Sequence, residues 1–84
     1  MTQTTISQNN VVLVTQGYAS QADSFLVYAE CPEGYIPISG GLYSNNQTSQ
    51  IEESYPDYVN NRWYVRANTF GTITVTAYVI CVKA

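Results

Sequence analysis

The chain has no histidine and only three basic residues, Arg62, Arg66 and Lys83, against six acidic ones. Without histidine, neither a Ser-His-Asp nor a Cys-His catalytic arrangement can form. Three basic residues and a net charge of −3 do not supply the clustered positive charge that neutralises nucleic-acid phosphates. We therefore predict a protein that is not an enzyme, uses no cofactor and binds no nucleic acid.

The acidic residues follow no pattern typical of a catalytic or metal site. Glu52 and Glu53 are adjacent and therefore point to opposite faces of a strand, whereas a glycosidase pair converges across a cleft. Together with Asp57 they are the best candidates for a calcium site, but their spacing matches no calcium loop. We expect solvated acids and no metal, with a calcium ion near these three residues as the alternative.

Long apolar runs are also missing. No stretch approaches the roughly 18–20 apolar residues that span a membrane as a helix, so we expect no membrane insertion. Residues 1–8 lack the basic start and apolar region of a signal peptide, which leaves the export route open. Residues 1–84 are expected to form one domain. Within it, residues 1–9 are either an extended arm that adds a strand to a neighbouring subunit or an ordinary first strand.

Alternating apolar and polar residues, and not a helical period, run through the chain. We predict strands near residues 3–7, 10–15, 24–31, 36–43, 49–54, 62–68 and 72–82. Glycine, proline and polar residues predict a loop at 17–23, a turn at 32–34, a hairpin loop at 44–47, a strand break at 55–57 and a turn at 60–61. Residues 70–71 are expected to join the last two strands as an antiparallel pair. This pattern favours an all-β fold, a small antiparallel β-sandwich or a jelly-roll-like barrel.

The two cysteines, Cys31 and Cys81, each lie on the apolar phase of an alternating segment. If both phases face one core, the sulfurs meet there as an intrachain disulfide. Such a bridge would close a loop of about 50 residues, for which the chain-entropy model gives roughly 4 kcal/mol. Two buried free thiols are the alternative. A disulfide would favour an extracellular or cell-surface location.

Strand phases also predict the rest of the core, because residues two apart share a face. The predicted interior consists of four sets: Phe25, Val27, Ala29 and Cys31; Ile36, Ile38, Gly40 and Leu42; Trp63, Val65 and Ala67; and Ile73, Val75, Ala77, Val79 and Cys81. The Gly40–Gly41 pair within a strand indicates a bulge or a close approach of two backbones.

Tyrosine is unusually abundant, with eight residues against two phenylalanines and one tryptophan. The phases opposite the predicted core carry five residues that we take as a candidate oligomer interface: Tyr28, Arg62, Tyr64, Arg66 and Tyr78. Tyrosine offers large, rigid contact area with a polar tip, which suits interfaces. A ligand-binding surface, or ordinary cross-strand pairing of residues with high β propensity, would give the same pattern.

A second aromatic cluster lies near the predicted turns. Its members, with a neighbouring loop asparagine, form a candidate carbohydrate-binding set: Asn45, Tyr55, Asp57, Tyr58 and Trp63. Loops on a rigid scaffold often carry binding residues, and aromatic rings can stack on sugars. The alternative is that these rings only pack over the end of a sandwich.

Several of these landmarks together resemble a pattern of small secreted or surface-associated bacterial β domains. The pattern comprises Cys31-Pro32-Glu33-Gly34, Ile38-Ser39-Gly40-Gly41, Ser54-Tyr55-Pro56, Trp63-Tyr64-Val65-Arg66-Ala67-Asn68 and Thr76-Ala77-Tyr78-Val79-Ile80-Cys81. It spans residues 31–81. The resemblance implies a cysteine bridge and an extracellular life, and it transfers no activity or catalytic residue.

These observations favour an extracellular recognition or assembly module that associates with itself. A lectin-like carbohydrate binder and a structural subunit of an extracellular fibre, appendage or particle are the two specific forms. The expected partner is a second copy of the chain, with a carbohydrate or cell-surface ligand as a further candidate.

Overall fold

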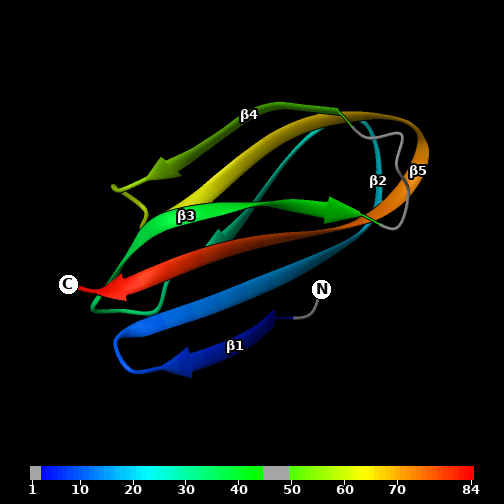
Figure 1. Ribbon diagram of the computed structural model, residues 1–84. Coiled ribbons are helices and arrows are strands. Elements are labelled where there is room, and N and C mark those ends of the chain that lie inside the picture. The colour runs from blue at the N-terminus through cyan, green and yellow to red at the C-terminus, as the bar shows by residue number, and fades with distance from the viewer. Residues whose placement is uncertain (1–2, 45–49) are drawn as a thin grey trace.

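The computed structural model describes residues 3–44 and 50–84, and these residues form five strands without a helix. The strands are β1 (Gln3–Gln8), β2 (Val11–Glu30), β3 (Tyr35–Ser44), β4 (Gln50–Asp57) and β5 (Arg62–Lys83). All pairs are antiparallel, in the order β1-β2-β5-β3, with β4 also paired to β5 (Figure 1). The sheet is nearly closed and barrel-like, so the predicted all-β class is confirmed.

Two long strands, β2 and β5, pair along their whole length and bend together (Figure 1). The bend coincides with register shifts around Gln21 and with positive φ angles at Ser20 (60°), Asp23 (55°) and Gly71 (78°). It divides the sheet into two layers. The first layer contains β1, the N-terminal half of β2, the C-terminal half of β5, and β3; the second contains the other halves of β2 and β5, and β4.

The bend corrects two predictions. Residues 17–23 are not a loop but a bulged part of β2, because their small and polar residues allow a strand to turn a corner. Residues 62–68 and 72–82 are not a hairpin but one strand, β5, and each part pairs with β2. The strand is continuous through Gly71, where a glycine accepts the positive φ.

The core lies between the two layers. Its buried residues are Val12, Val14, Phe25, Val27, Ala29, Cys31, Val65, Ala67, Ile73, Val75, Ala77, Val79 and Cys81, with Tyr18, Tyr35, Leu42 and Trp63 packed against them. Three of the four predicted phases are therefore correct. Cys31 directly follows β2 in the second layer, and Cys81 lies near the end of β5 in the first. Their disulfide, with a Cα–Cα distance of 6.0 Å, joins the layers at the end opposite the bend.

The fourth predicted phase, in β3, is wrong for two residues. Ile36 and Ile38 are exposed, and Pro37 is buried in their place. Pro37 pairs with Cys81 and Ser39 with Ile80, so that Ile38 is an extra, bulged residue. A one-residue bulge reverses which phase of a strand faces the core. Leu42, beyond the bulge, returns to the core.

Of the remaining predicted turns, those at 32–34 and 60–61 are correct and the strand break at 55–57 is wrong. Pro32 C=O accepts a bond from Tyr35 N–H (3.2 Å), and Gly34 has a φ of 89°, as expected for the turn at 32–34. Asn61 has a positive φ in the turn before β5. Residues 55–57 do not break the strand: Pro56 lies within β4, at the sheet edge, where its missing N–H costs no ladder bond. The predicted loop at 44–47 falls outside the described residues, apart from Ser44 at the end of β3.

Candidate interaction faces

The outer side of the second layer carries a cluster that we call the tyrosine face, formed by Tyr28, Tyr55, Arg62, Tyr64 and Arg66. Tyr28, Tyr64 and Tyr55 are cross-strand neighbours in one row over β2, β5 and β4. Tyr28 meets Tyr64 edge to face at 5.5 Å between centroids, and Tyr55 stacks on Tyr64 at 5.7 Å. These rings therefore contact one another as neighbours in a ladder.

Two arginines complete the tyrosine face. The Arg62 guanidinium lies 4.2 Å from the centroid of Tyr28 and 4.9 Å from that of Tyr64, which is cation–π geometry. Arg62 Nε is also 3.7 Å from a carboxylate oxygen of Asp57. Arg66 Nε donates a 2.8 Å hydrogen bond to Glu53, its cross-strand partner. Both positive charges thus lie beside acidic groups of the same chain.

Four of the five residues of the predicted interface come together on this face, and the fifth does not. Tyr78 lies on the outer side of the first layer, where it contacts Tyr43 at 6.3 Å between ring centroids. The sequence places Tyr78 on the phase opposite the core, and this is correct. However, the bend in β5 turns that phase toward one side of the molecule at Tyr64 and toward the other at Tyr78.

The predicted carbohydrate set does not form one site among the described residues. Asp57 organises its own turn: it accepts bonds from Val59 N–H, Asn60 N–H and the Asn60 side chain. The hydrogen bond from the Asn60 side-chain amide is the main reason why the pKa of the Asp57 carboxyl is lowered. Trp63 lies against the core, and its Nε1 donates to Ser54 Oγ at 2.8 Å.

Tyr58 is 66% exposed at the turn and has no ring contact with Trp63 among the described residues. Tyr55 belongs to the tyrosine face, as described above. Asn45 lies outside the described residues. The set therefore divides into three separate features: Asp57 caps its own turn, Trp63 packs against the core, and Tyr55 stacks on Tyr64.

The outer side of the first layer is different in character, and we call it the apolar face. Its outward positions follow the register across β1, β2, β5 and β3. Most of them are aliphatic or aromatic: Ile6, Val11, Leu13, Tyr78, Ile80, Val82, Ile36, Ile38 and Tyr43. Gln8, Thr15, Ser39 and Thr76 are uncharged polar residues on the same side. Ile38 is 51% exposed, and Ile6 and Tyr43 are each 58% exposed. None of the nine charged side chains of the protein occupies these strand positions.

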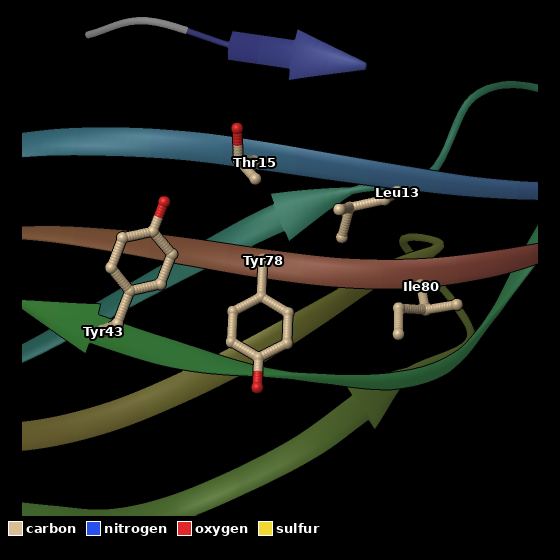
Figure 2. A pocket seen from close by; sticks show the side chains of 5 residues that line it. All are labelled: Leu13, Thr15, Tyr43, Tyr78 and Ile80. Carbon is tan, nitrogen blue, oxygen red and sulfur yellow. The ribbon is translucent and has the colours of Figure 1, made fainter. Parts of the chain in front are cut away.

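A shallow groove of about 390 Å³ lies at the centre of the apolar face. Figure 2 shows its five lining side chains on the same side of the sheet: Leu13 and Thr15 from β2, Tyr78 and Ile80 from β5, and Tyr43 from β3. Four of the five are apolar or aromatic. The groove can therefore receive apolar side chains of a partner but offers few groups that would orient a polar ligand.

Our interpretation of the sequence did not identify the apolar face, although the sequence carries a signal for it. Residues 11–14 and 78–82 are apolar on both phases, whereas a strand with one solvated face alternates. Apolar residues on both phases indicate a strand that is covered on both sides. Among residues 3–44 and 50–84, the core covers the inner side, and no described element packs over the outer side of β2 and β5 in the first layer.

The side chain of Tyr18 links the two layers by hydrogen bonds to the backbone of Tyr28. Its hydroxyl donates to Tyr28 C=O (2.8 Å) and accepts from Tyr28 N–H (3.3 Å), on the free edge of the C-terminal half of β2. Partial burial raises the pKa of the Tyr18 phenol above its usual value. The N–H and C=O groups of Tyr28, which lie at a free strand edge, thereby have a hydrogen-bond partner within the chain.

Replacing Tyr18 by phenylalanine should destabilise the fold by about 1 kcal/mol at neutral pH, because both Tyr28 groups lose their partner. Because the pKa of Tyr18 is raised in the folded state, the hydroxyl contributes fully to the free energy of unfolding below about pH 10. This contribution declines as the pH rises through the folded-state pKa. The difference in free energy of unfolding between wild type and Tyr18→Phe, measured by urea denaturation, should therefore become smaller above about pH 10. Tyr58→Phe, at an exposed turn, is the matched control and should match wild type at neutral pH. Equal stability of Tyr18→Phe and wild type would contradict the proposed role of the hydroxyl.

The chain matches no protein-family model, no curated protein and no solved structure. In residues 3–44 and 50–84 no helix is long and apolar enough to cross a membrane. The same residues contain no group of three or more Cys, Asp or Glu side chains placed to hold a metal ion.

Proposed function

We propose that this protein is a non-enzymatic extracellular assembly module whose copies associate through the apolar face. The observation that carries the proposal is a face of mainly aliphatic and aromatic side chains that has no charged residue, on a protein with a net charge of −3. Soluble monomers rarely expose contiguous apolar surface of more than a few hundred Å², and larger patches mark interaction sites.

A second copy is the partner that this face suits best. In a two-fold contact the same surface meets itself, so any charge near the axis faces a like charge. The apolar face has no charged side chain and avoids this repulsion. The acidic and basic residues lie on the second layer, at the bend, in the turn at 32–34 and at the ends of strands.

The size of the face is consistent with a reversible contact. Four strands about 4.8 Å apart and four rows of outward residues about 6.8 Å apart give a flat area of roughly 500 Å². Two such faces bury on the order of 1,000 Å², near the lower limit of specific interfaces. We therefore expect association that depends on protein concentration in the working range of light scattering.

The lectin-like alternative has weaker support from the geometry. A sugar-binding platform needs aromatic faces that are open to a ligand. On the tyrosine face, Tyr64 is stacked by Tyr55, and Arg62 lies over Tyr28 and Tyr64. The rings are thus engaged with one another and with a guanidinium group. A glycan array with the disulfide-intact protein is the test of this alternative.

The extracellular part of the proposal rests on the disulfide. Structural disulfides form and persist in oxidising compartments, and they are common in small secreted domains whose cores are limited. The Cys31–Cys81 bridge joins two buried residues in a chain of 84 residues. The resemblance to secreted bacterial β domains agrees with this location and remains a prediction.

Tyr43→Asp should disrupt association by placing a carboxylate on the apolar face. The two-fold contact would then bring like charges together and bury them without partners. We expect an at least tenfold weaker dimerisation constant in sedimentation velocity. At concentrations where both proteins are monomeric, the melting temperature should stay close to that of wild type, because Tyr43 is largely exposed.

Tyr58→Asp is the matched control, since Tyr58 has similar exposure but lies at the turn after β4. It should associate like wild type. If both variants associate equally well, the apolar face is not the interface. If wild type fails to associate at any concentration, self-association itself is excluded.

A further inference from the structure

The free edges of the sheet differ in one respect: all but one carry a feature that prevents pairing with another chain. β4 has Glu52, Glu53 and Asp57, a proline and a register shift at Glu52. β3 has Pro37 and the bulge at Ile38. The C-terminal half of β2 is covered at Tyr28 by the Tyr18 hydroxyl. Charges, prolines, bulges and coverage are the usual protections of edge strands.

β1 has none of these protections in its described residues. The strand Gln3–Gln8 is the end strand of the sheet and contains no charge and no proline. Its pairing with β2 is regular over all six residues, without a bulge. An uncharged, regular edge strand is a template for strand addition.

The register fixes which backbone groups of β1 face outward. Lys83 N–H donates to Asn10 C=O at 2.9 Å, and bonding alternates along an antiparallel strand. Val12 and Val14 therefore bond to β5, and Val11 and Leu13 bond to β1. Since Leu13 pairs with Ile6, the backbone groups of Ile6 face β2, and those of Thr5 and Ser7 face the free edge.

We propose that β1 pairs with β1 of a second copy, antiparallel about a two-fold axis through Ile6. Thr5 of each copy then lies opposite Ser7 of the other, and their outward N–H and C=O groups form the new ladder. Ile6 lies opposite Ile6 of the second copy as a non-hydrogen-bonded pair, whose side chains are the closer of the two kinds. This register covers an isoleucine that is 58% exposed in the single chain.

The edge contact extends the apolar face and does not compete with it. Ile6 is an outward residue of the first layer, so a two-fold axis perpendicular to the sheet puts both apolar faces on the same side. Two edge-paired dimers can then stack face to face as a closed four-chain assembly with perpendicular two-fold axes. The edge contact itself depends only on β1 and stands if the stacking fails.

Cysteine cross-linking tests the register directly. Ile6→Cys should form an interchain disulfide under mild oxidation, because the two Cβ atoms lie within about 5.5 Å in the proposed pair. Gln8→Cys, on the same face of the same strand, is the control. In this register residues 8 and 8 of two copies lie about 14 Å apart along the strands, beyond disulfide reach. We expect at least tenfold faster dimer formation by Ile6→Cys, followed on non-reducing gels with Cys31–Cys81 intact.

Equal rates for the two variants, or no dimer from either, would overturn the edge contact. The same pair is then measured in a Tyr43→Asp background, which removes face association. Retained cross-linking by Ile6→Cys supports an edge contact independent of the apolar face. If cross-linking disappears with face association, the contact at Ile6 belongs to the face and the proposed edge pairing is wrong. This comparison separates failure of the edge contact from failure of the apolar face.

Discussion

Replacing both Cys31 and Cys81 by alanine is expected to lower the free energy of unfolding by about 4 kcal/mol, the loop-closure value for a bridge across about 50 residues. The bridge joins the two layers at the end opposite the bend. Without it, the folded ribbon of β2 and β5 is held closed only by packing and by the seams between layers. For a domain of this size the loss corresponds to a fall in melting temperature on the order of 20 °C.

The reduced wild-type protein is the control for this prediction. If the bridge acts mainly on the unfolded chain, reduction should lower the stability of wild type to nearly that of the double variant, and reductant should not affect the variant. A variant that stays much less stable than reduced wild type would contradict this, because the loss would then come from altered packing around the buried cysteines. Urea denaturation with and without dithiothreitol measures both differences.

Gly40→Ala is expected to lower the free energy of unfolding by about 1 to 3 kcal/mol or more. The added methyl group would overpack the contact between the two layers at Trp63. A Cβ at Gly40 would overlap the Trp63 ring and lie 2.6 Å from the backbone oxygen of Tyr78. Trp63 comes from the second layer and is fixed by its bond to Ser54. Neither the indole nor the β5 backbone can move without opening the contact between layers.

The neighbouring glycine supplies a matched control. A Cβ at Gly41 would lie 2.7 Å from the hydroxyl oxygen of Tyr78, the far end of a side chain on the apolar face. The Tyr78 ring covers Gly41 but is itself partly exposed and can swing outward, so Gly41→Ala should cost less than about 1 kcal/mol. The emission of Trp63, the one tryptophan, should change in Gly40→Ala and stay unchanged in Gly41→Ala. Equal losses for both variants would contradict the assigned roles of the two glycines.

Most of the core could be predicted because its strands are regular where they face it. Phe25, Val27, Val75 and Val79 follow the two-residue period, and the period alone places both cysteines inside. The prediction that Ile36 and Ile38 face the core was wrong, because one extra residue in β3 reverses which side chains point inward on one side of the bulge. No local pattern marks a bulge at Ile38 itself. The Gly40–Gly41 pair, which predicted a bulge or a close approach of two backbones, instead makes room mainly for the side chains of Trp63 and Tyr78.

The bend explains why the interaction faces were harder to predict. Gly17–Asp23 has the composition of a loop, yet it continues β2 through positive φ angles at Ser20 and Asp23. A strand that bends sends one alternating phase to two sides of the molecule. The two-residue alternation therefore assigns Tyr64 and Tyr78 to the same face of the strand, whereas the bend places them on different sides of the molecule. The apolar runs at residues 11–14 and 78–82 are the signal for a second apolar face, and they are recognised only when both phases of a strand are considered.

Light scattering coupled to size-exclusion chromatography, on non-reduced wild-type protein over a hundredfold range of concentration, tests the central claim most directly. Self-association through the apolar face predicts a mass that rises with concentration from the 9.3 kDa of one chain toward a small whole-number multiple. The Tyr43→Asp protein should stay at 9.3 kDa or rise only at much higher concentration. A wild-type mass of 9.3 kDa throughout the range would contradict the claim and would turn attention to a different partner for the apolar face.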